Sequence, residues 1–148
     1  MQFQISSARP EDFPAWVKIR YALWPDCPPE RHALEIEQLL ATQGLVAFAR
    51  AGNEIIGFAE VSIRRDHVEG TTIAPVPYLE GWFVAEPHRG HGIGRALLKF
   101  VEDWSRAHGY VELASDAELQ NTHGITLHTQ LGFREVARTV HFVKPLPS

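Results

Sequence analysis

The sequence predicts one mixed α/β domain, in which a central β-sheet is flanked by about four helices. The chain has 148 residues, the size of one ordinary domain that can bury a hydrophobic core. Apolar stretches of strand length are interleaved with amphipathic stretches of helix length. No repeat, linker or low-complexity tract divides the chain, so residues 1–148 are expected to form a single domain.

The order of the elements follows from the period of the apolar pattern, which is about 2 in strands and about 3.6 in helices. The expected strands are 3–7, 45–51, 54–64, 78–84, 111–115 and one or two within 134–144. The expected helices start at 10–12 and run from 28 to 44, from 93 to 109 and from 122 to 131. Prolines and acids open them and glycines end the second and third, as is typical of helix termini. Residues 66–77 are polar and broken by glycine and proline, which predicts an edge loop.

Composition argues against several classes of function. The formal charge is −4 and the pI is about 6.0, whereas a nucleic-acid-binding protein needs a clustered basic face. Cys27 is the one cysteine, so neither a disulfide framework nor a multi-cysteine zinc site is expected. His88 and His91 have no matching acid or cysteine pair, so no metal is expected. The sequence has no signal-like start and no apolar run of membrane-spanning length, which predicts a soluble, cytoplasmic protein without a membrane partner.

A basic, glycine-rich turn lies between the expected strand at 78–84 and the helix that starts at 93. It reads His88-Arg89-Gly90-His91-Gly92-Ile93-Gly94-Arg95. At a helix N-terminus, free backbone N–H groups and the helix dipole hold phosphate, and glycines let a pyrophosphate approach the main chain. The dinucleotide motif G-x-G-x-x-G fails, because Arg95 or Leu97 stands at its last glycine, and no P-loop motif occurs. We therefore expect a different kind of phosphorylated cofactor at this turn.

The pattern that does fit is Arg89-x-x-Gly92-x-Gly94, which resembles the acetyl-CoA pyrophosphate loop of the GCN5-related N-acetyltransferase (GNAT) family. The surrounding order also resembles that family: a strand before the loop, a strand after the helix, then Asn121 and the Gly132-Phe133 pair. Within the family the chain is similar to the aminoglycoside 6'-N-acetyltransferases, on the stretches 23–26, 79–81, 114–116 and 138–144. The resemblance covers essentially the whole chain.

This resemblance implies a GNAT-like fold and a bacterial enzyme that uses acetyl-CoA and no metal. The acceptor would be the 6'-amino group of an aminoglycoside antibiotic, attacked directly without a covalent enzyme intermediate, and the result would be antibiotic resistance. A homodimer is implied as well. Two alternatives stay open: an acetyltransferase acting on another small amine or a protein N-terminus, and a non-catalytic acyl-CoA sensor. A strongly acidic pocket around Glu80 and Asp116 would favour the aminoglycoside.

The resemblance also assigns roles to individual residues. Glu80 would be the base, acting through water, and Asp116 would bind a substrate ammonium. The N–H of Val84 would donate to the thioester carbonyl oxygen. The expected cofactor-binding residues are Phe83, Val84, Arg89, Gly90, His91, Gly92, Ile93, Gly94, Arg95 and Asn121. The expected substrate-binding residues are Trp24, Asp26, His67, Glu80, Asp116 and Glu135.

Ordinary structural roles compete for several of these residues. Glu80 fits a solvated carboxylate equally well, and Asp116 and Asn121 fit helix N-caps or Asx turns. Trp24 fits simple core packing.

Two histidines stand where relatives commonly have tyrosine. His128 is a third catalytic candidate, because imidazole can supply a proton to the departing thiolate, although a helix histidine is more often packing or surface. His67 lies in Arg64-Arg65-Asp66-His67-Val68-Glu69-Gly70, where an aromatic residue that touches the sugar would affect the substrate range.

Overall fold

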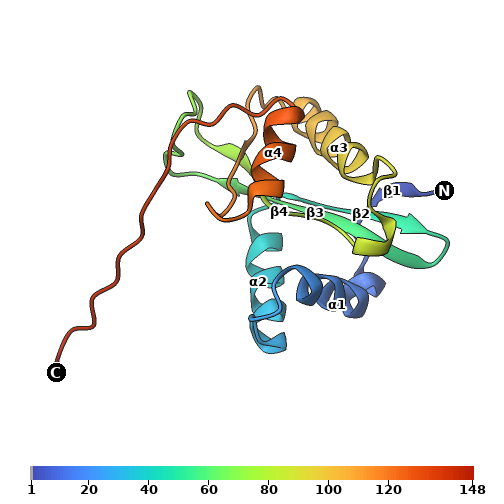
Figure 1. Ribbon diagram of the computed structural model, residues 1–148, viewed down its shortest axis with the longest axis horizontal. Coiled ribbons are helices and arrows are strands. Elements are labelled where there is room, and N and C mark those ends of the chain that lie inside the picture. Colours follow the sequence, from blue (N-terminus) through green and yellow to red (C-terminus); the bar gives the residue numbers. More distant parts are fainter. Residues whose placement is uncertain (1) are drawn as a thin grey trace. The chain divides into compact units, whose positions relative to one another are not determined.

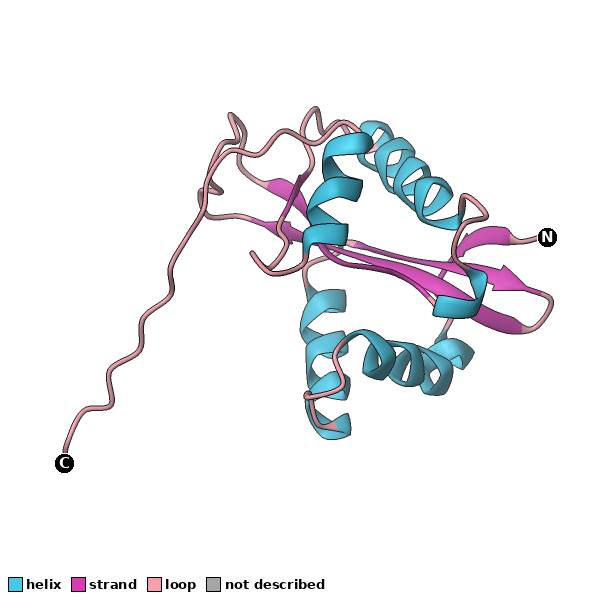
Figure 2. Cartoon of the chain, in the orientation of Figure 1, coloured by secondary structure: helices cyan, strands magenta, loops and turns pink. Residues whose placement is uncertain are grey.

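The computed structural model describes residues 2–148, which form two compact units, 2–116 and 117–148. The first unit is a sheet with helices on both faces (Figures 1 and 2). Its strands are β1 (Gln4–Ser7), β2 (Leu45–Ala51), β3 (Glu54–Arg64), β4 (Val76–Val84) and β5 (Ala114–Ser115). Its helices are α1 (Phe13–Leu23), α2 (Pro29–Ala41) and α3 (Ile93–Ala107), with short 3-10 turns η1 (Pro10–Asp12) and η2 (Glu86–His88).

The sheet is mixed, as the sequence predicts. Its order is β1-β2-β3-β4-β5, and the first four strands pair antiparallel with their chain neighbours. β5 pairs parallel to β4, at Tyr78 with Ala114 and at Leu79 with Ser115. Parallel neighbours need a crossover, and α3 supplies it. The predicted strand at 111–115 is thus shortened to its last two residues.

Two apolar layers hold the sheet. On one face, α1 and α2 pack over β3, with Trp16, Ile36 and Phe58 in the buried core. On the other face, α3 packs over β2, β3 and β4 (Figure 1). The helical period of its stripe, Ile93 and Val101 included, brings the side chains against the sheet, where they are buried.

A β-bulge interrupts β4 at Glu80. Gly81 lies opposite Glu60 and Leu79 lies opposite Val61, so Glu80 is the extra residue between the two pairs. Because side chains alternate between the faces of a sheet, one extra residue inverts the facing of everything after it. Phe83 accordingly lies on the α1/α2 face, at 6.1 Å between ring centroids from Phe58.

The second unit contains α4 (Thr122–Gln130), which Asn121 caps. The strands predicted within 134–144 are absent from the structure, where this segment carries no regular secondary structure. A strand requires a neighbouring strand to accept its hydrogen bonds. Residues 117–148, all of them described, contain no such partner for it. Its apolar alternation therefore predicted a strand that the single chain does not form.

None of the helices within residues 2–148 has both the length and the apolar character that crossing a membrane requires.

Candidate functional site

A cavity of about 450 Å³ opens in the first unit, between β3, β4 and the helices α1 and α2. Its charged lining residues are Arg20, Glu35, Glu60, Arg64 and Glu80. Three carboxylates against two guanidinium groups leave the lining one negative charge in excess. The cavity is therefore suited to a cationic ligand.

Glu80 lies in this cavity, at the bulge. Its Oε2 accepts a 2.5 Å hydrogen bond from the Ser62 hydroxyl and a 3.0 Å bond from Nε of Arg64. Its Oε1 accepts a 2.8 Å bond from Nη2 of the same guanidinium. Arg64 thus binds the carboxylate in a bidentate manner, through two guanidinium nitrogens, which is the strongest geometry for this pair.

Asp116 is linked to the same group. It follows β5, and its Oδ2 accepts a 2.5 Å hydrogen bond from the Tyr78 hydroxyl. The Arg64 guanidinium carbon lies 3.4 Å from the centre of the Tyr78 ring. Burial and the hydrogen bond to Asp116 both raise the pKa of Tyr78, so this phenol keeps its proton at neutral pH. The two predicted acceptor-site carboxylates are thereby connected through Arg64 and Tyr78.

Trp24 forms a wall of the cavity, and a glycine makes room for it. A Cβ atom placed on Gly81 would lie 2.7 Å from Cη2 of Trp24, closer than real contacts allow. The indole also packs at 6.1 Å from the Phe58 ring and at 4.7 Å from the Arg20 guanidinium. Gly81 therefore leaves the space that the Trp24 indole occupies beside the strand.

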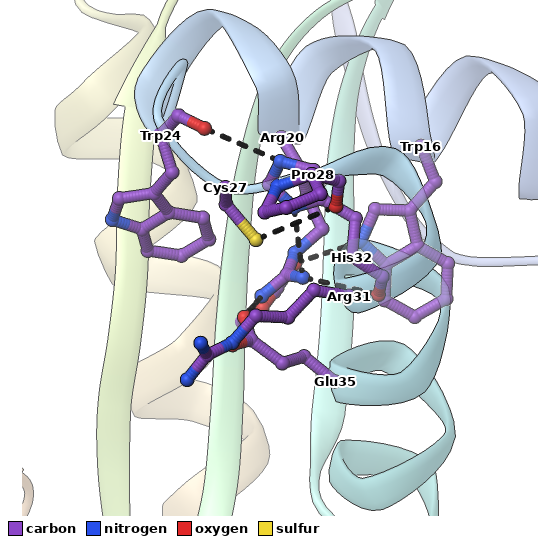
Figure 3. Close-up of polar contacts among 9 residues, drawn as sticks. Trp16, Arg20, Trp24, Cys27, Pro28, Arg31, His32 and Glu35 are labelled. Atoms are coloured by element: carbon purple, nitrogen blue, oxygen red, sulfur yellow. Dashed lines mark hydrogen bonds and ion pairs between the residues drawn. The ribbon is translucent and has the colours of Figure 1, made fainter.

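Beneath the cavity lies a buried polar network that sequence reasoning missed (Figure 3). Nε of Arg20 donates to Oε2 of Glu60 at 2.8 Å, and the Trp16 indole donates to the same oxygen at 2.7 Å. Figure 3 shows Arg20 pointing from α1 toward His32 and Glu35 of α2, with which it makes contacts of 3.2 and 3.1 Å. Burial raises the pKa of Glu60, and the Arg20 charge opposes that shift.

Cys27, His32 and Glu35 bring potential metal-ligand atoms within 4.8 Å of one another. Both ring nitrogens of His32 already have neighbours: Nδ1 faces Arg20 at 3.2 Å, and Nε2 faces the Trp24 carbonyl at 3.3 Å. A neutral imidazole that accepts from Arg20 and donates to that carbonyl satisfies both contacts. A metal ion here would displace one of these bonds and face the guanidinium charge, so the geometry favours packing over coordination.

The glycine-rich turn has the geometry of an anion-binding loop. Gly90 and Gly92 have φ angles of 84° and 80°, and no other atom lies within 4 Å of where a Cβ would stand. Gly92 is the N-cap of the 15-residue helix α3, whose first amides have no acceptor within the helix. The guanidinium of Arg89 is anchored by a 2.8 Å bond from Nε to the Val84 carbonyl. These residues fit a pyrophosphate group.

The adjoining part of β4 offers an open edge. β4 pairs with β5 only at Tyr78 and Leu79, and within residues 2–116 no strand pairs with β4 on that side from Glu80 onward. Phe83 and Val84 lie in this stretch, directly before the turn. An extended ligand arm can take the place of a strand there.

The remaining predicted site residues are spread more widely. Asp26 is exposed in the turn after α1 and does not line the cavity. His67 is exposed in the loop after β3, with Nε2 3.9 Å from a Glu69 carboxylate oxygen. Neither is brought to Glu80 by this structure.

Three predicted residues belong to the second unit. Oδ1 of Asn121 accepts a 2.9 Å bond from the Gly124 amide, so the competing N-cap role is present. Nδ1 of His128 lies 2.7 Å from the Gly124 carbonyl, and its ring packs edge-on against Phe133 at 4.9 Å. Glu135 is exposed and pairs with Arg138, which lowers the pKa of the carboxyl.

Residues 7–133 match the sequence model of a family described as the acetyltransferase (GNAT) family. The chain belongs to this family. An aminoglycoside N(6')-acetyltransferase type 1 of Stenotrophomonas maltophilia is 42% identical over 143 residues, covering 96% of this chain and 93% of that protein. A protein of the same description from Serratia marcescens is 38% identical, covering 92% of this chain and 94% of that protein.

A solved GNAT structure agrees with the fold. AAC(6')-Iy in complex with the bisubstrate analogue CoA-S-monomethyl-acetylneamine superposes with a TM-score of 0.89 at 33% identity, covering 99% of this chain and all of that chain. The predicted GNAT-like fold is confirmed, and residues 2–148 contain a mixed sheet and four α-helices.

Proposed function

We propose that the protein is an acetyl-CoA-dependent acetyltransferase that modifies the 6'-amino group of aminoglycoside antibiotics and so confers resistance to them. The observation that carries this proposal is the acidic cavity at Glu80, which lies on the same strand as the open edge before the glycine-rich turn. Relatives that cover nearly the whole chain are named for this reaction, and a related structure contains a CoA–aminoglycoside analogue.

The cofactor half of the proposed site consists of β4 and the turn after it. Backbone amides of 90–95 and the charges of Arg89 and Arg95 would hold the pyrophosphate. The backbone of Phe83 and Val84 would pair with the pantetheine arm, and Asn121 would add a side-chain contact. Acetyl-CoA supplies an activated acetyl group, and the Val84 N–H would stabilise negative charge on its carbonyl oxygen.

The acceptor half must hold an amine and remove its proton. An alkyl ammonium with a pKa of about 9 costs about 2.7 kcal/mol to deprotonate at pH 7, at about 1.36 kcal/mol per pKa unit. We assign this task to Glu80, directly or through water, and substrate binding to Asp116 with Trp24 as a wall. His128 would return a proton to the CoA thiolate. Asp26, His67 and Glu135 would form outer contacts with the sugar.

We further propose that the enzyme is a cytoplasmic homodimer. The C-terminal segment contains an apolar alternation without a strand partner, and Phe142 and Val143 are 92% and 93% exposed. A second copy of this segment would supply the missing ladder and cover these side chains. Light scattering is expected to give twice the chain mass of 16.7 kDa. A monomer at micromolar concentration would contradict this part of the proposal.

The decisive experiment measures CoA thiol release by the purified protein with kanamycin or tobramycin, against a panel of polyamines and peptides. Glu80→Gln is expected to lower kcat by about 10²- to 10⁴-fold, the usual contribution of a general base. Glu86→Gln, an exposed carboxylate on the same chain segment outside the cavity, is the matched control. Thiol release only with other amines would mean that the protein is an acetyltransferase of the same family with a different acceptor. Acetyl-CoA binding without any turnover would indicate a sensor.

A further inference from the structure

The acceptor cavity contains a cation from the protein itself, because the Arg64 guanidinium is bound to the proposed base, Glu80. All three hydrogen bonds to the Glu80 carboxylate come from within the protein: two from Arg64, at 2.8 and 3.0 Å, and one from Ser62. A carboxylate offers about four lone-pair positions. An incoming ammonium therefore meets an acceptor that is largely occupied.

We propose that Arg64 is a specificity-determining residue, an internal competitor that holds the substrate ammonium's place on Glu80 and thereby selects polycationic acceptors. This inference rests on the proposed function, because it names what that site selects. No covalent bond is made or broken in the exchange: two hydrogen bonds from Arg64 to Glu80 are replaced by hydrogen bonds from the substrate ammonium. Because Arg64 stays tethered beside the carboxylate, the site gains the charge of the bound substrate.

The position of Arg64 makes such an exchange possible. It is the last residue of β3, at the mouth of the cavity, and its side chain is 43% exposed while that of Glu80 is 28% exposed. An ion pair of this exposure is weak, because water screens both charges. The guanidinium also stands on the Tyr78 ring at 3.4 Å, a face that can hold it when Glu80 is taken by substrate.

The selection follows from effective concentration. A tethered guanidinium competes at an effective concentration in the millimolar range or above, which one free ammonium does not overcome at low concentration. A polycation brings several ammonium groups to a cavity with excess negative charge, so each bound group raises the local concentration of the next. Acceptors with one amine therefore bind Glu80 less well than acceptors with several.

The test compares kcat/KM for kanamycin with kcat/KM for 6-amino-6-deoxyglucose, a single ring with one amine. Arg64→Gln is expected to lower the ratio of the two by about three- to fivefold, through a lower KM for the monoamine, because a solvent-screened ion pair opposes a competing cation by no more than about that factor. Arg64→Lys is expected to restore most of the wild-type ratio, because it restores the competing charge. Arg65→Gln removes the same charge from the neighbouring exposed residue, which does not line the cavity, and is expected to leave the ratio unchanged.

Each other outcome has a definite meaning. Wild-type turnover of kanamycin with an unchanged ratio in Arg64→Gln overturns this inference and leaves the proposed function standing. A raised KM for both acceptors in Arg64→Gln also overturns it, because Arg64 would then be an ordinary binding or structural residue. Absence of kanamycin turnover by the wild type overturns the proposed function, and the inference falls with it.

Discussion

Two arginine–glutamate pairs line the same cavity, and burial separates them. In the Arg20–Glu60 pair the side chains are 5% and 2% exposed, whereas in the Arg64–Glu80 pair they are 43% and 28% exposed. The contact distances are equal, at 2.8 Å. A desolvated pair cannot release one partner without leaving an uncompensated charge, but a half-exposed pair can trade its partner for water or substrate. The first pair therefore belongs to the scaffold and the second to the site.

The largest effect on stability is expected for Arg20→Met, which removes the cation of the buried pair. Removing the cation leaves the Glu60 carboxylate buried and unpaired, which is expected to lower the free energy of unfolding by about 3–5 kcal/mol. Urea denaturation followed by circular dichroism measures this loss. The double variant Arg20→Met/Glu60→Leu is expected to recover much of it, and a single variant as stable as the wild type would contradict the assignment to the scaffold.

Gly81→Ala tests the wall of the cavity that Trp24 forms. The added methyl group would stand 2.7 Å from the Trp24 indole, so the cavity wall must move. Overpacking of this kind lowers the free energy of unfolding by about 1–3 kcal/mol. We also expect a higher KM for the acceptor and a change in the intensity of tryptophan fluorescence. The double variant Gly81→Ala/Trp24→Phe removes the indole atoms that the added methyl group would meet, so it is expected to recover part of this loss. Unchanged KM and stability would show that Trp24 is not held as described.

A third pair, Arg50–Asp12, sharpens the comparison because its exposure is intermediate, at 14% and 9%. The pKa of Asp12 is lowered from 3.8 to about 2, and the main cause is its hydrogen bonding to Arg50. A lowered carboxyl pKa stabilises the fold above the unfolded value, and this stability is lost as pH falls from about 5 toward 2. Arg50→Gln is expected to remove about 1–2 kcal/mol at pH 7 and to flatten the acid dependence over that window. An acid titration of Tm that is equally steep in the variant would refute this.

The smallest effect is expected at the exposed pair itself. Arg64→Gln should change the free energy of unfolding by less than about 1 kcal/mol, because solvent already screens this interaction. Thermal unfolding of Arg64→Gln beside Arg65→Gln measures the difference. A loss as large as that of Arg20→Met would place both pairs in the scaffold and remove the distinction between them.

Local features were predictable from the sequence, and pairs made by the fold were not. The period of the apolar pattern identified the hairpin and α3, and glycine spacing identified the turn at Gly90 and Gly92. No residue type indicates the bulge at Glu80, or that Arg64 and Ser62 bind its carboxylate. Glu60 meets Trp16 across 44 residues of chain, which no local pattern reveals. One signal was available: Glu60, Ser62 and Arg64 alternate as a polar row within an otherwise apolar strand.

In the C-terminal segment, by contrast, the sequence predicted an element that the structure lacks. The alternation around Val140 predicted a strand, but alternation states only which face is apolar, and a ladder needs a second chain segment to form. The strand at 111–115 was overextended as well, since only Ala114 and Ser115 pair with β4.

The extra residue in β4 constrains how this strand can change over time. The bulge places Glu80 beside the regular pairs that follow it, Trp82 with Ala59 and Phe83 with Phe58. Deleting one residue at 78 or 79 would close the ladder and bring Glu80 opposite Val61, on the side of the sheet that faces α3, while Phe83 stayed opposite Phe58. A single codon loss would thus take the Glu80 carboxylate out of the cavity without moving the packing of Phe83. Point substitutions leave the pairing of the strands intact. We therefore expect this strand to diversify in residue identity while its length stays fixed.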